Sequence, residues 1–245
     1  MIVKSTDLYP HFRLEKNLDL QAYVESFMTP SRIQNLKNVL ENRMRHMCLV
    51  AENFIDEFNV HAMIRTSECF GLQDFHNIGQ KNVLMKKNKS VNRGAFQWTH
   101  IYDYTECEEP TLTCIKNLKS KGYRVYATSS HLNANYTPEN IPIDQPIAVI
   151  LGKEHEGISD VALKHCDGLV SIPMYGFTES FNVSVAASLL TQTIVERIRK
   201  SDIQWQFSDV EKEDLYYEWI WHSIKYPEKL YHDWTAMRSE VFSKK

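Results

Sequence analysis

The chain has 245 residues, with 28 Lys and Arg against 31 Asp and Glu, so its net charge is −3. Its 43% hydrophobic and 24% charged residues are ordinary for a soluble globular protein of one domain with appendages, or of two small domains. No apolar run approaches the roughly 20 residues that cross a bilayer, and the N-terminus has no apolar secretory core. Composition therefore argues against a membrane protein and a generic polyanion binder.

The five cysteines show no CxxC spacing. An odd number without a framework predicts reduced thiols and a cytoplasmic location. Metal sites favour paired ligands at short spacing, so no metal is expected.

Helices and strands are expected to alternate after a weakly patterned segment, 1–30. Thr29-Pro30-Ser31 is a helix start, with a capping hydroxyl and proline in the first turn. Helices are expected near 31–46, 59–70, 112–120, 160–165 and 182–199, and strands near 48–51, 74–78, 123–127, 146–151 and 169–172.

This alternation predicts an α/β fold: a parallel sheet with helices on both faces. We expect an N-terminal extension over 1–30, a main domain over 31–200, and a C-terminal helical tail over 201–245. The tail carries an amphipathic helix from about 209, expected to dock on the body of the protein rather than on a membrane.

Basic residues concentrate in two segments, although the whole chain is mildly acidic. A run of this kind is often only a solvated loop, but on one face it could bind a phosphate backbone. The candidate phosphate-binding residues are Arg32, Arg43, Arg45, Lys86, Lys87, Lys89 and Arg93, with Arg197 and Arg199 extending them.

Three motifs carry the most specific signal, and neither GxGxxG nor a P-loop is present. The first runs from Asn59 through Arg65 to Gly71, the second is Leu151-Gly-Lys-Glu154-His-Glu-Gly157, and the third joins Ile172-Pro-Met174 to Ser180-Phe-Asn182. In this order and spacing they resemble the SpoU/TrmH family of SPOUT-class RNA ribose 2′-O-methyltransferases. The resemblance covers about 31–200, and the basic insert is most similar to the tRNA D-loop guanosine branch. Phe181 departs from the leucine usual in the family.

The resemblance implies a deep trefoil knot over about 147–200 that holds S-adenosyl-L-methionine. True knots are rare exceptions among protein folds. The residues expected to hold the cofactor are Thr128, Leu151, Gly152, Ile172, Met174 and Phe181. Glycine permits close backbone approach, and the apolar side chains form a slot suited to adenine.

The resemblance assigns catalysis to Arg65, Asn59, Glu154, Ser180 and Asn182. Arg65 is proposed in the family to help deprotonate the ribose hydroxyl. Because arginine is effectively always protonated, electrostatic stabilisation of the forming alkoxide is physically easier. Taken alone, Arg65 would read as a surface ion pair with Glu68, Ser180 as a helix N-cap, and Glu154 as a solvated loop residue.

The leading functional hypothesis is a tRNA 2′-O-methyltransferase acting on a D-loop guanosine. A ribosomal RNA 2′-O-methyltransferase of the same family is an alternative, although 30 residues are too few for the separate N-terminal RNA-binding domain that such enzymes often carry. The second alternative is a non-catalytic RNA-binding protein that has the knot. The expected partners are RNA, preferably tRNA, and a second copy of the chain in a homodimer, without DNA or membrane.

Overall fold

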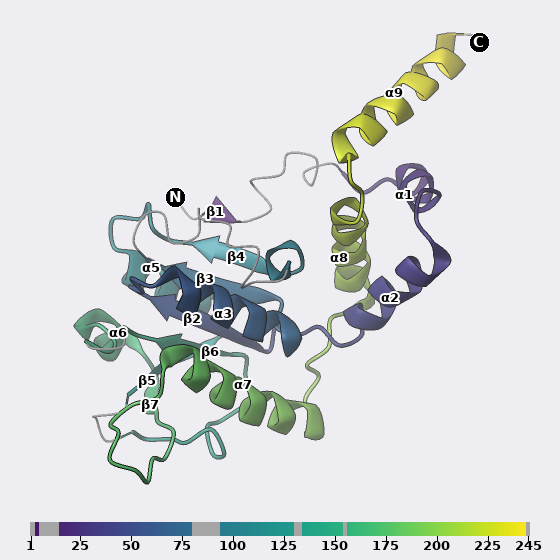
Figure 1. The fold of residues 1–245 in the computed structure, drawn as a ribbon. Helices are drawn as coiled ribbons and strands as arrows, with labels where there is room; N and C mark the ends of the chain where they lie inside the picture. Colours follow the sequence, from purple (N-terminus) through teal and green to yellow (C-terminus); the bar gives the residue numbers. More distant parts are fainter. Residues whose placement is uncertain (1–2, 5–14, 80–93, 130–133, 154–155, 244–245) are drawn as a thin grey trace. The chain divides into compact units, whose positions relative to one another are not determined.

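The computed structural model describes residues 3–4, 15–79, 94–129, 134–153 and 156–243. The chain divides into two compact units (Figure 1). The sheet unit comprises Met1–Ser5 and Met44–Gln206, and the helical unit comprises Thr6–Arg43 and Phe207–Lys245. This division differs from the predicted one, because residues 31–43 belong to the helical unit.

The sheet unit is built on a seven-stranded sheet in the order β1-β4-β3-β2-β6-β5-β7. All neighbouring strands are parallel except β1, which pairs antiparallel with β4 at one edge. The predicted parallel sheet is therefore confirmed. The strands are β1 (Val3–Lys4), β2 (Met47–Glu52), β3 (Asp74–Ile78), β4 (His100–Asp103), β5 (Arg124–Thr128), β6 (Ile147–Leu151) and β7 (Gly168–Val170).

Helices cover both faces of this sheet (Figure 1). Successive side chains of a strand point to opposite faces, so Met47, Leu49 and Ala51 of β2 enter one core and Cys48 and Val50 enter the other. The first core is closed by α3 (Glu57–Cys69) and α7 (Val183–Lys200), and the second by α5 (Pro110–Ser120) and α6 (Asp160–His165).

Local sequence accounts for most helix ends. The side chain of Asp56 caps α3, and that of Asn182 caps α7. Gly71 follows α3 with φ 82°, a conformation that glycine adopts without strain. The predicted helix near 31–46 is shorter, since α2 (Pro30–Leu40) ends at Leu40. Sequence analysis missed β1, β4, the short 3₁₀ helix η3 (Ala95–Gln97), and α1 (Leu18–Glu25).

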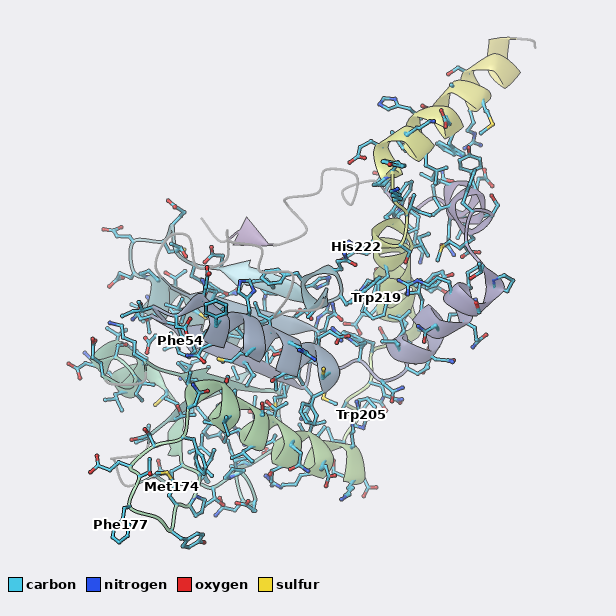
Figure 2. The ribbon with its side chains drawn as sticks, viewed as in Figure 1. Phe54, Met174, Phe177, Trp205, Trp219 and His222 are labelled. Carbon is cyan, nitrogen blue, oxygen red and sulfur yellow. The ribbon has the colours of Figure 1, made fainter. Side chains whose placement is uncertain are left out.

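The helical unit packs α8 (Asp209–His222) against α1 and α2, while α9 (Pro227–Ser243) contacts α1. Its interior is aromatic, with Trp219 and Trp221 each about 1% exposed. Figure 2 shows Trp219 on α8. A capping box at Ser208 and Glu211 starts α8, as the acidic beginning of this segment suggests. Within the described ranges, no helix combines the length and apolarity needed to cross a membrane.

Candidate active site

A cavity of about 360 Å³ lies at the carboxyl ends of three neighbouring parallel strands. The last residues of β5, β6 and β7, which are Thr128, Leu151 and Val170, all line it. Ligands of open α/β sheets commonly bind at this edge, where the connecting loops meet.

The six residues expected to hold the cofactor meet around this cavity, although they span 54 positions of the chain (128 to 181). The cavity is lined by Thr128, Leu151, Gly152, Ile172, Met174 and Phe181. Ile172, Met174 and Phe181 come from the loop between β7 and α7, on which Figure 2 labels Met174 and Phe177. The lining also includes Lys153, Glu156 and Asp160, which sequence analysis did not single out.

Gly152, Lys153, Gly157 and Ile158 line the cavity and are called the hairpin wall, because Lys153 and Gly157 pair as an antiparallel bridge. The backbone N–H of Lys153 donates to the carbonyl of Gly157 at 3.1 Å, and the N–H of Gly157 donates back to Lys153 at 2.9 Å. A Cβ atom added at Gly152 would overlap the backbone of Gly157. Glycine is therefore required at Gly152 for the hairpin to close.

Two asparagines join the first and third motifs. The side-chain amide of Asn182 donates to Oδ1 of Asn59 at 3.3 Å, while Oδ1 of Asn182 accepts from the backbone N–H of Ser184 at 2.9 Å. Asn59 is buried in the first turn of α3 instead of at its cap, which is Asp56. Ser180 lines the cavity, and because Asn182 is the cap of α7, the reading of Ser180 as the cap is wrong.

Arg65 lies on the exposed side of α3, and the cavity lining formed by the described residues of this single chain does not include it. Its neighbour Thr66 bonds Ser188 of α7 at 3.1 Å between their hydroxyl oxygens, so the helix that carries Arg65 is held against the helix that follows the third motif. Glu154 lies outside the described residues, and its predicted role stays a prediction.

Seven of the nine predicted phosphate-binding residues fall into three groups. Lys86, Lys87, Lys89 and Arg93 lie outside the described residues. In the helical unit, Arg32 is half-buried and donates to the Ser223 hydroxyl at 3.4 Å. In the sheet unit, Arg197 donates to the carbonyl of Pro138 at 2.8 Å, and Arg199 stacks over Trp205. Burial lowers the pKa of both the Arg197 and Arg199 guanidinium groups.

Two other arginines are used inside the protein. Arg43 is only 1% exposed and lies over the Trp219 ring, 5.5 Å from its centroid, so its prediction as a phosphate contact is wrong. The sequence could not show this, since Trp219 is 176 positions away (219 − 43). Nε of Arg45 donates to the carboxylate of the buried Asp74 at 3.1 Å, which gives Arg45 a structural role.

The lining has the chemical character that S-adenosylmethionine needs: an apolar slot, a closely approached backbone at Gly152, and hydroxyl and charged groups at its rim. In the described part of the chain, no group of three or more His, Cys, Asp or Glu side chains is placed to hold a metal ion. All five cysteines are free.

Comparisons with known proteins agree with this geometry. The model of the SpoU rRNA Methylase family matches residues 46–192. The tRNA (guanosine(18)-2′-O)-methyltransferase of Borreliella burgdorferi is 33% identical over 210 residues, which cover 84% of this chain and 94% of that protein.

Solved structures show the same fold. The A. aeolicus TrmH/SpoU tRNA modifying enzyme superposes with a TM-score of 0.68 at 23% identity, covering 79% of this chain and 97% of that one. The SpoU methyltransferase AviRb from Streptomyces viridochromogenes, solved in complex with AdoMet, superposes with a TM-score of 0.53 at 19% identity, covering 67% and 62%. The prediction drawn from the three motifs is thus confirmed, and the chain belongs to the SpoU methylase family.

Proposed function

We propose that the protein is an S-adenosylmethionine-dependent tRNA ribose 2′-O-methyltransferase that acts on a guanosine of the D-loop. The observation that carries this proposal is the cavity at the carboxyl ends of β5, β6 and β7, which collects the residues expected to hold the cofactor and Ser180. The name of the B. burgdorferi relative, which matches along most of its length, supports tRNA as the substrate. We place this activity in the cytoplasm, in keeping with free cysteines.

The cofactor would supply a methyl group that is already activated on a sulfonium. The protein then has to bind the cofactor, orient the ribose hydroxyl toward the methyl group, and assist the loss of the hydroxyl proton. Ile172, Met174 and Phe181 exclude water from the slot, and Gly152 lets the backbone approach the ligand. We assign Ser180, which lines the cavity, to orienting the ribose hydroxyl. We assign Arg65 to the developing negative charge on the ribose oxygen, where a fixed cation lowers the barrier.

The third-motif loop also supports an RNA substrate. Tyr175 and Phe177, on the same loop as Met174, are fully exposed aromatic side chains. Figure 2 shows Phe177 on this loop. Bases that are unpaired in RNA loops commonly stack on such rings. We further propose that the segment from about 147 to 200 forms the trefoil knot of the family.

The proposed enzyme works as a homodimer in which Arg65 of one copy serves the cavity of the other. Phe58 lies seven residues before Arg65, which places both on one side of α3, and both are exposed. On the adjacent α7, Val185 and Leu189 are 45% and 40% exposed and lie four residues apart on one side. Exposed apolar side chains on two neighbouring helices are suited to a protein interface.

Two measurements test the activity. Calorimetry measures S-adenosylmethionine binding in the presence of a chelator, and mass spectrometry locates 2′-O-methylguanosine in tRNA incubated with the protein. We expect binding without metal and methylation in the D-loop. Methylation of ribosomal RNA alone would favour the ribosomal alternative, and cofactor binding with no methylation of either RNA would favour the non-catalytic one.

Subunit complementation tests the shared site. At a cofactor concentration well below the Kd of Gly152→Ala, we expect the Arg65→Ala and Gly152→Ala proteins each to have little activity alone and to regain part of it when unfolded and refolded together, because the mixed dimer contains one intact arginine facing one intact cavity. Sedimentation of the active wild type as a monomer, or an inactive mixture in which mixed dimers are present, would contradict the arrangement.

A further inference from the structure

Glu52 places a carboxylate in the interior of the protein, at the last position of β2. Glu52 is only 1% exposed. Oε1 accepts from the Thr111 hydroxyl at 2.6 Å and from the Ser159 hydroxyl at 2.7 Å, and Oε2 accepts from the backbone N–H of Ser159 at 2.9 Å. Hydrogen bonds to an ionised acceptor are among the stronger ones in proteins.

Ser159 connects the residues that line the cavity to the start of α6. It follows directly on Gly157 and Ile158, which line the cavity, and its hydroxyl accepts from the backbone N–H of Ala162 to cap α6. At the other end of the hairpin, Leu151 of β6 is paired with Ala51 of β2, the residue that precedes Glu52. Both ends of the wall are therefore tied to the same end of β2.

We propose that Glu52 is a positioning residue, whose carboxylate holds Ser159 and thereby keeps the backbone pairing between Lys153 and Gly157 in the geometry that binds the cofactor. This role rests on the proposed methyl-transfer function, since that function is what gives the cavity its ligand. Glu52 does not line the cavity and acts through Ser159.

The structure provides a matched control. Ser159 and Thr111 each donate a hydroxyl hydrogen bond to the same oxygen at nearly the same distance, but Thr111 belongs to α5, while Ser159 follows Ile158 of the cavity lining. Ser159→Ala and Thr111→Val each remove one hydrogen bond from Glu52. If Glu52 has only a structural role, the two variants should have the same affinity for the cofactor. If Glu52 positions the cavity wall, only Ser159→Ala should lower that affinity.

The experiment measures two quantities in both variants: hydrogen exchange of the Lys153 and Gly157 amides without cofactor, and the Kd for S-adenosylmethionine. We expect faster exchange and a roughly tenfold higher Kd in Ser159→Ala, the loss of about one hydrogen bond to a charged group. We expect wild-type exchange and Kd in Thr111→Val, and restoration of both in Ser159→Thr, which keeps the hydroxyl.

A double-mutant cycle separates the bond to Glu52 from the capping of α6. In a Glu52→Ala background, Ser159→Ala should add little to the Kd, whereas a capping effect would persist in full and overturn the proposal. If Glu52→Ala does not fold, equal exchange and equal Kd in the two single variants still overturn it. Absence of cofactor binding by the wild type would instead contradict the proposed function, while the exchange comparison still decides the role of Glu52.

Discussion

Polar side chains occur in two contrasting regions of the sheet unit. Around the cavity they lie on loops beyond the strand ends, half-buried or exposed, as Lys153, Glu156 and Ser180 do. In the interior of β3 and β4 they lie within the strands themselves: Asp74, His76 and His100 are at most 6% exposed. The first set lines a cavity that is open to a ligand, and the second set is enclosed among other protein groups.

The side chains of the interior cluster contact one another at short distances. Asp74 accepts from Nε of Arg45 at 3.1 Å and lies 3.5 Å from the His100 imidazole. His76 stacks on Tyr102 and lies 3.0 Å from the Tyr104 hydroxyl. Burial raises the pKa of Asp74, but the His100 imidazole and the Arg45 charge outweigh it and hold that pKa well below its usual range. Burial lowers the pKa of His76 to about 4.

The two regions of the sheet are expected to differ in role: the strand ends in function, and the interior cluster in stability. Changes at the strand ends should affect ligand binding and turnover with little effect on folding, because those groups are partly hydrated already. Changes in the interior cluster should affect the free energy of unfolding, because a buried group that loses its partner carries the full desolvation cost. The predictions below test this separation, beginning with the largest expected effect.

Arg65→Ala should lower the rate of methyl transfer by about 10³-fold, because a preorganised cation is removed from the developing charge. S-adenosylmethionine affinity should stay within about twofold of wild type, since Arg65 does not line the cavity of its own chain. Single-turnover methylation and calorimetry on the same preparation measure both. Arg238→Ala, which breaks an exposed pair with Asp19, is the control. Near-normal turnover in Arg65→Ala would remove this residue from the active site.

His76→Phe should flatten the pH dependence of stability between pH 6.5 and about 4. The folded pKa is below the unfolded one, so the native state binds fewer protons in this window. Wild-type stability is therefore complete above pH 6.5 and falls by up to ~3 kcal/mol as the pH drops toward 4. Urea unfolding across this range measures the slope.

The matched control is Tyr104→Phe, which removes the hydrogen bond to His76 but leaves the imidazole in place. It should retain the wild-type slope at a lower overall stability. The window below pH 4 belongs to Asp74, whose depressed pKa gives stability that is lost only on further acidification. An unchanged slope in His76→Phe would assign the titration to another group.

Gly152→Ala should raise the Kd for S-adenosylmethionine by tenfold or more, on the order of the cost of displacing a packed backbone segment. The added Cβ would overlap Gly157, and the hairpin wall would have to open. Gly176→Ala is the control on the third-motif loop, since a Cβ there meets nothing within 4 Å. Equal affinities in the two variants would show that the hairpin wall does not contact the cofactor.

The sequence predicted the region at the strand ends far better than the interior cluster. Gly152, Ile172 and Ser180 stand in contiguous motifs, so the resemblance of those motifs to a known family was enough to associate them with one site. Asp74 and His100 pair across strands although they lie 26 positions apart (100 − 74) in the sequence, and polar residues inside a short strand merely weaken its apolar signal. For the same reason β4 was missed, and Glu52 looked like the end of an apolar run.

The smallest expected effect concerns the arginines that remain candidates for RNA. Arg199→Ala should weaken tRNA binding and reduce the salt slope by about one unit, the value for one lost phosphate contact. Arg199 is half-buried over Trp205, which orients it without enclosing it. Arg43→Met is the contrasting variant: it should lower stability and leave the slope unchanged, because Arg43 is enclosed against Trp219. Filter binding at several salt concentrations measures both slopes. An unchanged slope for Arg199→Ala, beside a reduced slope for Lys86→Glu with Lys87→Glu, would move the RNA surface from the end of α7 to the basic insert.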